Sequence, residues 1–252
     1  MIVSTDAIVL HAMKYGDTSK IVTLYTRRYG KLKVIAKGVR AAKNKAGASL
    51  EPMTIAAVVF YKKQNRELSL LAKSEIARPL NHLFSVEEKM IAGLALVELL
   101  SVAMHDEHED EPVFDSSVEA LAEIDRAAKN PLNIFIRFVL GLIHSHGYSL
   151  TLDRCMKCGT PSDDGQGSYR FQLSEGTIVC PACAESYALS GMPVSRGAIK
   201  SLRFLMQSSF ADSTGLSLTI SARDEILEVL FAFMKYHIAG MRTLRTLSLF
   251  YS

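Results

Sequence analysis

Four cysteines are the residues of this 252-residue chain whose spacing predicts chemistry most directly. They form two pairs, Cys155-Met-Lys-Cys158 and Cys180-Pro-Ala-Cys183, which are separated by 21 residues. A Cys-x-x-Cys pair can present both thiolates to one metal ion, and two such pairs complete a tetrahedral site. Because protein sulfur then fills all four positions, the pattern is typical of a structural ion. We therefore predict one structural Zn²⁺ ion held by Cys155, Cys158, Cys180 and Cys183.

Two other interpretations of the cysteines compete with zinc. Paired disulfides are rare in proteins of reducing compartments, and a redox-active dithiol requires only one of the two pairs. Zinc accounts for all four cysteines at once, and it would fold a short ribbon that is too small to bury a core of its own.

Positive charge gathers in the first 80 residues, which hold 15 Lys and Arg against 5 Asp and Glu, whereas the whole chain carries only +3. No acidic residue occurs from Thr18 through Leu50. So basic a segment attracts polyanions such as nucleic acid, although a solvated face that aids solubility is the plainer interpretation. We predict phosphate contacts from eight of its side chains: Arg27, Arg28, Lys31, Lys33, Lys37, Arg40, Lys43 and Lys45.

Short apolar runs separated by turn residues predict five β-strands in the same segment, over residues 7–10, 21–26, 32–36, 55–60 and 68–72. Five strands in so short a stretch favour a closed oligonucleotide-binding barrel (OB-fold), because closure leaves no exposed edge.

The third predicted strand indicates how such a barrel would present its charge. Leu32, Val34 and Ala36 fall on one side of an extended chain and are expected to join the core. The opposite side is expected to be cationic, because it carries Lys31, Lys33 and Lys37. Nearby aromatic side chains could stack on bases, although each is more commonly a core residue: Tyr25, Tyr29, Phe60 and Tyr61. A second basic group lies at the turn before the fifth strand: Lys62, Lys63 and Arg66.

From Ser85 onward the apolar period changes from two to about 3.6 residues, which predicts helices. Ser85 followed by Glu88 indicates a capping box at the start of the first one. The expected helices cover residues 86–104, 117–129, 131–147 and 195–208 and a segment that starts at residue 221. The acidic segment 105–111 is expected to be a solvated loop rather than a metal site.

Together these elements predict an α+β multidomain protein. An OB-fold domain is expected over residues 1–80, followed by a helical domain in two parts, residues 81–150 and 191–252. The Cys₄ zinc ribbon, residues 151–190, is expected to be inserted between the two helical parts.

Motifs of several enzyme classes are missing: the sequence has no phosphate loop, Gly-x-Gly-x-x-Gly, His-Glu-x-x-His or Gly-x-Ser-x-Gly. We therefore interpret the chain as a binding protein and not an enzyme. A nuclease that uses the carboxylates of residues 105–111 is the remaining enzymatic hypothesis. No apolar run is long enough for a membrane span and no signal-peptide pattern opens the chain, so a cytoplasmic location without membrane attachment is expected.

Short motifs along nearly the whole chain match one protein family: Ala7-Ile-Val-Leu10, Tyr15-Gly16-Asp17, Gly30-Lys31, Ala36-Lys37-Gly38-Val39-Arg40, Leu50-Glu51-Pro52, Gly147-Tyr148 and the four cysteines. In these residues the chain resembles the bacterial RecO family of recombination mediator and DNA repair proteins. The resemblance implies an N-terminal OB barrel, a helical domain and an inserted zinc ribbon. It also implies a nucleoid-associated protein that binds single- and double-stranded DNA, anneals complementary strands and relieves the block by single-strand binding protein. RecR and RecF are the implied partners in loading RecA recombinase (the RecFOR pathway).

Residue roles follow from the same resemblance. Lys37 and Arg40 match the family's Ala-Lys-Gly-x-Arg motif, whereas Ala41-Ala42 depart from the Arg or Lys followed by Ser that many relatives have there. Arg137 resembles a position that meets the acidic, apolar C-terminal tail of single-strand binding protein, although a surface ion pair is an equally good role for it. A basic tail segment of the family resembles Arg242 and Arg245.

A function of another class remains as the alternative. The chain would then be a non-mediator adaptor whose basic barrel binds RNA or an acidic protein partner, with the ribbon as a docking face.

Overall fold

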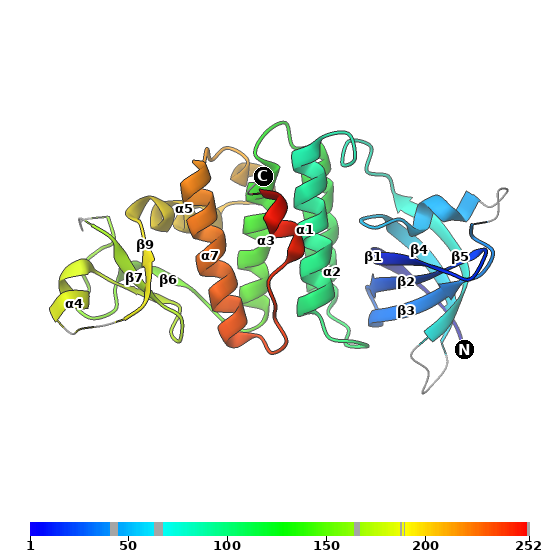
Figure 1. Cartoon of the computed structure of the whole chain (residues 1–252), viewed down its shortest axis with the longest axis horizontal. Helices are drawn as coiled ribbons and strands as arrows, with labels where there is room; N and C mark the ends of the chain where they lie inside the picture. The colour runs from blue at the N-terminus through cyan, green and yellow to red at the C-terminus, as the bar shows by residue number, and fades with distance from the viewer. Residues whose placement is uncertain (41–44, 63–67, 164–166, 187, 189, 251–252) are drawn as a thin grey trace. The chain divides into compact units, whose positions relative to one another are not determined.

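The computed structural model describes the chain except for residues 41–44, 63–67, 164–166, 187, 189 and 251–252. It has the expected α+β class, with a barrel, helices and a small cysteine-bearing sheet (Figure 1). Two compact units divide the chain, one formed by residues 1–126 with 244–252 and the other by residues 127–243. Among the described helices, none combines the length and the apolar character that crossing a membrane requires.

Five strands form the barrel of the first unit: β1 (Ile2–Tyr15), β2 (Ser19–Thr26), β3 (Gly30–Ala36), β4 (Ile55–Tyr61) and β5 (Leu68–Arg78). They close in the order β1-β2-β3-β5-β4, in which only the β3–β5 pair is parallel. This closed five-stranded arrangement is the predicted OB-fold. Apolar side chains fill its interior, among them Val9, Val22, Leu24, Val34, Val58 and Phe60.

The first strand is longer than the sequence pattern indicates. Its apolar run ends at Leu10, but an irregularity between Val9 and His11 shifts the register, and pairing with β2 continues as far as Tyr15. A bulge of this kind turns a strand without ending it, so the polar and exposed residues after Leu10 stay in the sheet.

The helices of the first unit are α1 (Glu87–Ala103) and α2 (Glu111–Arg126), with the short 3₁₀ turns η1 (Lys45–Leu50) and η2 (Arg245–Phe250). The predicted capping box is wrong, because the N-cap of α1 is Val86, which makes no side-chain cap bond. Ser85 instead donates its hydroxyl to the His82 carbonyl oxygen. Helix α2 begins six residues before the expected start, and Asp110 caps it by accepting a hydrogen bond from the Val113 amide at 3.0 Å.

The second unit contains the helices α3 (Pro131–Ser145), α5 (Arg196–Gln207), α6 (Phe210–Ser213) and α7 (Ile220–His237), which pack on one another. Gly147, at φ +84°, follows the end of α3, as the sequence predicts. Hydroxyl N-caps begin the later helices, since Ser195, Ser209 and Thr219 each accept a bond from an amide three residues on.

A four-stranded sheet completes the second unit, with the order β6-β8-β7-β9. Its strands are β6 (Thr151–Cys155), β7 (Tyr169–Gln172), β8 (Thr177–Val179) and β9 (Met192–Val194), and α4 (Pro181–Ser186) follows β8. Phe171 of β7 packs edge-on against Phe233 of α7, with ring centroids 5.9 Å apart. The sheet is therefore anchored to α7 by a buried aromatic contact.

Candidate nucleic-acid interface and metal centre

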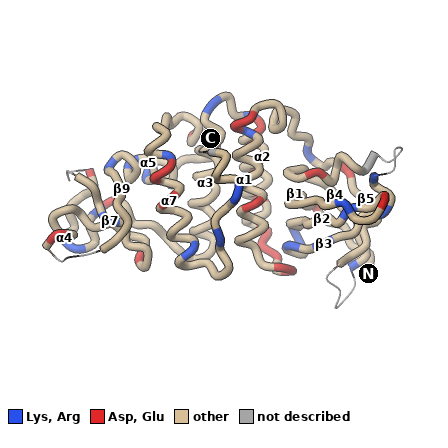
Figure 2. The backbone as a smooth tube through the Cα atoms, viewed as in Figure 1, with Lys and Arg blue, Asp and Glu red and all other residues tan. Residues whose placement is uncertain are grey.

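The outer face of β3 carries the exposed lysines that the sequence predicts. Val34 and Ala36 are buried in the barrel, whereas Lys33 and Lys37 are exposed. Register with β2 places Lys33 opposite Thr23. The alternation of core and cationic faces is thus present, and Lys and Arg mark this strand in Figure 2.

Four of the eight predicted phosphate contacts are exposed side chains: Arg28, Lys33, Lys37 and Arg40. Arg40 donates from Nη1 to the carbonyl oxygens of Gly16, at 3.3 Å, and Asp17, at 3.2 Å. It therefore holds the β1–β2 turn beside the segment that follows β3. Lys43 lies outside the described residues, as do Lys63 and Arg66, and the side chain of Lys45 is likewise outside the description.

The remaining two predicted contacts, Arg27 and Lys31, are paired with carboxylates of the same unit. Arg27 donates from Nε and Nη2 to the two carboxylate oxygens of Asp115, both at 2.9 Å, and it lies 3.0 Å from Glu111. The guanidinium of Arg27 holds the pKa of Asp115 below its usual value. Lys31 donates from Nζ to the Ser101 carbonyl oxygen at 2.8 Å and lies 3.3 Å from Asp106.

Residues 105–110 of the acidic segment form a loop, as expected, whereas Glu111 already begins α2. The sequence did not indicate that the segment would dock on β3. The Glu107 amide donates to the Lys31 carbonyl oxygen at 2.9 Å. Gly30, at φ +62°, lies so close to the segment that a Cβ atom there would meet the His108 carbonyl oxygen at 2.3 Å. Lys62 adds a longer pair to Glu107, at 3.7 Å. The segment therefore pairs with Lys31 and Lys62 at one end of the basic face, whereas no ion pair holds Lys33 or Lys37 among the residues that the structure describes.

Three of the four aromatic residues considered for base stacking are held in packing contacts. Phe60 is buried in the barrel interior, and Tyr29 packs edge-on against it with centroids 5.9 Å apart. Tyr25 is fully buried on the other side of β2, where its ring lies 5.8 Å from that of Phe114 of α2. Burial raises the pKa of Tyr25, whose hydroxyl donates to the Asp110 carbonyl oxygen. Tyr61 is exposed. Tyr15, whose side chain is also exposed, was not among the predicted stacking residues, because the apolar pattern places no strand there.

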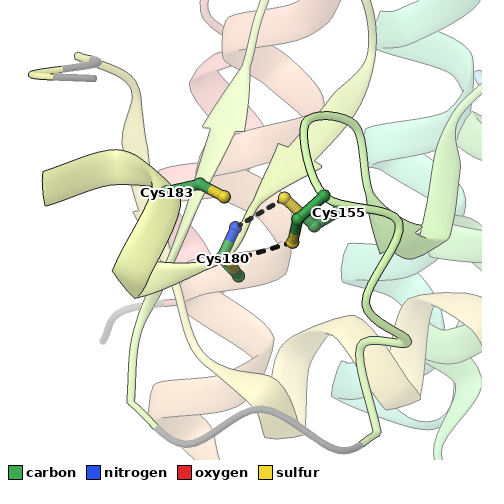
Figure 3. Close-up of side chains that lie close together, drawn as sticks. Cys155, Cys180 and Cys183 are labelled. Carbon is green, nitrogen blue, oxygen red and sulfur yellow. Dashed lines mark hydrogen bonds between the residues drawn. The ribbon is translucent and has the colours of Figure 1, made fainter. Parts of the chain in front are cut away.

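The four cysteines converge on one point. Their sulfur atoms all lie within 4.8 Å of one another, and Cys158 Sγ is 3.7 Å from Cys180 Sγ. Cys155 ends β6, while Cys180 and Cys183 lie at the start of α4 (Figure 3). The amides of Lys157 and Cys180 donate to Cys155 Sγ at 3.4 and 3.3 Å. Within the part of the chain that the structure describes, no other group of three or more metal-binding side chains is close enough to share an ion.

This donor set fits a thiophilic metal ion. A hydrogen bond with Thr160 lowers the pKa of the Cys158 thiol to about 6, while one with Cys158 raises the pKa of Cys183 to about 12. Four sulfurs this close cannot all carry a charge unless a cation lies between them. A Cys₄ set with amide donors to sulfur is typical of structural zinc and of iron–sulfur sites.

Arg137 lines a pocket in the second unit. Its Nε donates to the Ser208 carbonyl oxygen at 2.7 Å, and its guanidinium carbon lies 5.8 Å from the centroid of the Phe210 ring. The pocket has a volume of about 270 Å³, and its lining includes Arg137, Leu140, Tyr148, Leu150 and Met206. No carboxylate partner holds Arg137 among the interactions of the described residues. Arg242 and Arg245 are exposed, and the Arg245 amide donates to the Glu98 carboxylate.

Known proteins are similar to this chain along its whole length. The family model for the N-terminal part of recombination protein O matches residues 1–80, and the model for its C-terminal part matches residues 87–246. A DNA repair protein RecO from Chloroherpeton thalassium is 30% identical over 254 residues, which cover 99% of this chain and 98% of the relative. The DNA repair protein RecO of Desulfatibacillum aliphaticivorans is 30% identical over 239 residues, or 94% and 92% of the two chains. That of Streptomyces coelicolor is 33% identical over 186 residues, or 71% and 73%.

Docking of the acidic segment on β3 predicts that Gly30→Ala is strongly destabilising. A side chain at positive φ costs about 1–2 kcal/mol, and the overlap with the His108 backbone adds a similar amount, so we expect a loss of about 2–4 kcal/mol. Urea unfolding followed by circular dichroism measures it.

Gly16→Ala is the matched control. Gly16 has φ +56°, but a Cβ atom at this position would have nothing within 4 Å, so only the backbone cost of about 1–2 kcal/mol is expected. Equal losses of unfolding free energy in the two variants would show that the backbone of the acidic segment is not in contact with Gly30 in solution.

Proposed function

Because the chain belongs to the RecO family of DNA repair and recombination proteins, we propose that it is a recombination mediator without catalytic activity of its own. It binds single- and double-stranded DNA, anneals complementary strands and helps to load RecA recombinase onto DNA coated with single-strand binding protein. RecR and RecF are its partners in this proposal, and its place in the cell is with the DNA of the nucleoid.

The observation that carries the proposal is the exposed cationic face of the barrel. Lys33 extends from β3 and Lys37 directly follows its last residue, with Arg28 and Arg40 near the two ends of the strand; all four side chains are exposed. Phosphates attract such side chains whatever the base sequence, because each contact releases condensed counterions. Two strands that are each partly neutralised repel one another less, so base pairing alone decides which strands anneal.

Reversing the two open lysines tests this mechanism. We expect Lys33→Glu/Lys37→Glu to weaken binding of a fluorescent single strand by about tenfold or more at 0.1 M salt, because two phosphate contacts become repulsive. Annealing of complementary strands coated with single-strand binding protein should slow in parallel. Fluorescence anisotropy and a dye-pair annealing assay give the two readouts.

The control variant, Lys129→Glu/Lys200→Glu, makes the same change of charge on exposed side chains of the second unit and should anneal like the wild type. If the barrel variant keeps its DNA affinity but loses a protein or RNA partner, the adaptor alternative replaces the mediator.

For the metal centre we propose one structural Zn²⁺ ion, bound by Cys155, Cys158, Cys180 and Cys183. The closeness of the four sulfurs and the amide bonds to Cys155 support a site in which protein sulfur fills every position. The ion would contribute stability to the small sheet, whose strands are only three to five residues long.

Elemental analysis checks the metal. We expect about one zinc per chain in the wild type and none after Cys155→Ser, because Cys155 is buried and its sulfur also accepts two amide bonds. The unfolding transition of the second unit should move to lower temperature in that variant. Iron in place of zinc, or full zinc content in the variant, would contradict the assignment.

We also propose that the Arg137 pocket receives the acidic C-terminal tail of single-strand binding protein. A half-buried guanidinium beside apolar side chains suits a peptide that ends in a carboxylate and carries an apolar residue. This arrangement supports the role that the family resemblance implies for Arg137.

A tail peptide labelled with a fluorophore tests the pocket. We expect Arg137→Ala to weaken its binding by about tenfold or more, since charge-assisted hydrogen bonds contribute about 1.5–3 kcal/mol. Arg154→Ala is the control, because Arg154 is exposed in the same unit and pairs only weakly with Asp153 at 3.2 Å. Equal affinities of both variants would place the tail elsewhere.

A further inference from the structure

An apolar row crosses the outside of the barrel, on the face opposite to the core. Strand register sets Met13 opposite Ile21, Ile21 opposite Ile35, Ile35 opposite Leu70, and Leu70 opposite Tyr61. Met13 is 50% exposed and Tyr61 40% exposed, and the other three are at least partly accessible. The neighbours of these residues along each strand, such as Val22, Val34 and Phe60, are buried in the interior.

Cations and an aromatic ring border the row where it crosses β1, β2 and β3. Lys33 and Lys37 lie two residues to either side of Ile35, on the same face and both exposed. Tyr15, which is 52% exposed, lies two residues beyond Met13 on the same face of β1. We call Met13, Tyr15, Ile21 and Ile35 the base platform. Residues 11–15, 19–26 and 30–36 contain no Asp or Glu, so no carboxylate of these strands repels a polyanion there.

Apolar side chains with lysines on either side are complementary to an unpaired nucleotide. Its base offers a flat apolar face, and its phosphates carry negative charge on either side. Lys37 directly follows β3, so at about 3.3 Å per residue its Cα atom lies within about 13 Å of that of Lys33, and their ammonium groups can reach phosphates on either side of a base between them. In a duplex the faces of the bases are buried by stacking on one another. A duplex can therefore bind the lysines through its phosphates, but its bases cannot contact the apolar side chains.

From this juxtaposition we infer that the base platform is a contact site for the bases of single-stranded DNA, with bases lying against Ile35 and stacked on Tyr15 and their phosphates on Lys33 and Lys37. The inference rests on the proposed function, since it names how the same face treats an unpaired strand. It gives the barrel a means of holding single strands more tightly than duplex, so that the annealed product is released.

Tryptophan fluorescence tests the contact directly, because the chain has no tryptophan. Tyr15→Trp introduces a single indole at the edge of the base platform, and stacking of a base quenches indole emission. Titration with an oligothymidylate of about 20 nucleotides should quench the emission in step with the anisotropy of the labelled strand. A duplex of the same length should bind with much less quenching. Tyr236→Trp, at a position 61% exposed on α7 of the second unit, is the control and should not be quenched.

Affinities provide the second readout. Tyr15→Ala should weaken single-strand binding by about 5- to 150-fold, the range that loss of one stacked base gives, and leave duplex binding within about twofold. Tyr236→Ala should change neither. Because Tyr15 is largely exposed, we expect the thermal unfolding midpoint of Tyr15→Ala to match that of the wild type.

Each outcome separates the inference from the function on which it rests. Quenching by single strands together with a selective loss in Tyr15→Ala supports the base platform. Wild-type binding of DNA with no quenching and no effect of Tyr15→Ala overturns it while leaving the proposed function intact. Equal loss of single-strand and duplex affinity also overturns it, since the side chain would then act on the backbone alone. A wild-type chain that binds neither form of DNA removes the proposed function first, and the inference with it.

Discussion

The period of two in β3 is the constraint on which the proposed interface depends. A closed barrel must bury one side of every strand, and burying Val34 and Ala36 leaves Lys33 and Lys37 no place except the outside. A slip of one residue would bring lysines into the core, where unpaired charge is costly. Packing of the hydrophobic core thus fixes the positions of the lysines, so the cationic face requires no additional hydrogen bonds or ion pairs to keep it on the outside.

Electrostatic pairing within the first unit then divides that charge. Asp115 of α2 pairs with Arg27 and Asp106 of the acidic segment pairs with Lys31, both close to where β3 begins. Among the described residues, no ion pair holds Lys33 or Lys37 toward the other end of the strand. Exposed pairs of this kind add little stability and are screened by salt. Their effect is instead to restrict where on the barrel a polyanion finds unpaired cations. The second unit differs, because its small sheet has four converging cysteines and an aromatic contact with α7.

Sequence patterns correctly predicted those features that depend on residues close to one another in the chain. Strand alternation, the two Cys-x-x-Cys pairs and the closure of α3 by Gly147 each depend on residues close in sequence, and each is present. The capping box failed because Ser85 found a nearer acceptor at His82, and α2 began early because Asp110 supplied a cap that the apolar pattern does not register. Pairs such as Arg27 with Asp115 join residues that are 88 positions apart, and sequence spacing cannot predict contacts over that distance. The prediction missed Tyr15 because the apolar run of β1 ends at Leu10, whereas the strand continues past the bulge through polar residues to Tyr15.

The salt dependence of single-strand binding tests the central claim, that exposed cations of the barrel bind phosphates without reading bases. With four exposed cations in contact, a plot of log K against log salt concentration should have a slope of about −3, and Lys33→Glu/Lys37→Glu should reduce its steepness to about −1.5 or less. Oligonucleotides of different base sequence should give the same slope. A slope near zero in the wild type, or the same steep slope in the variant, would contradict the account.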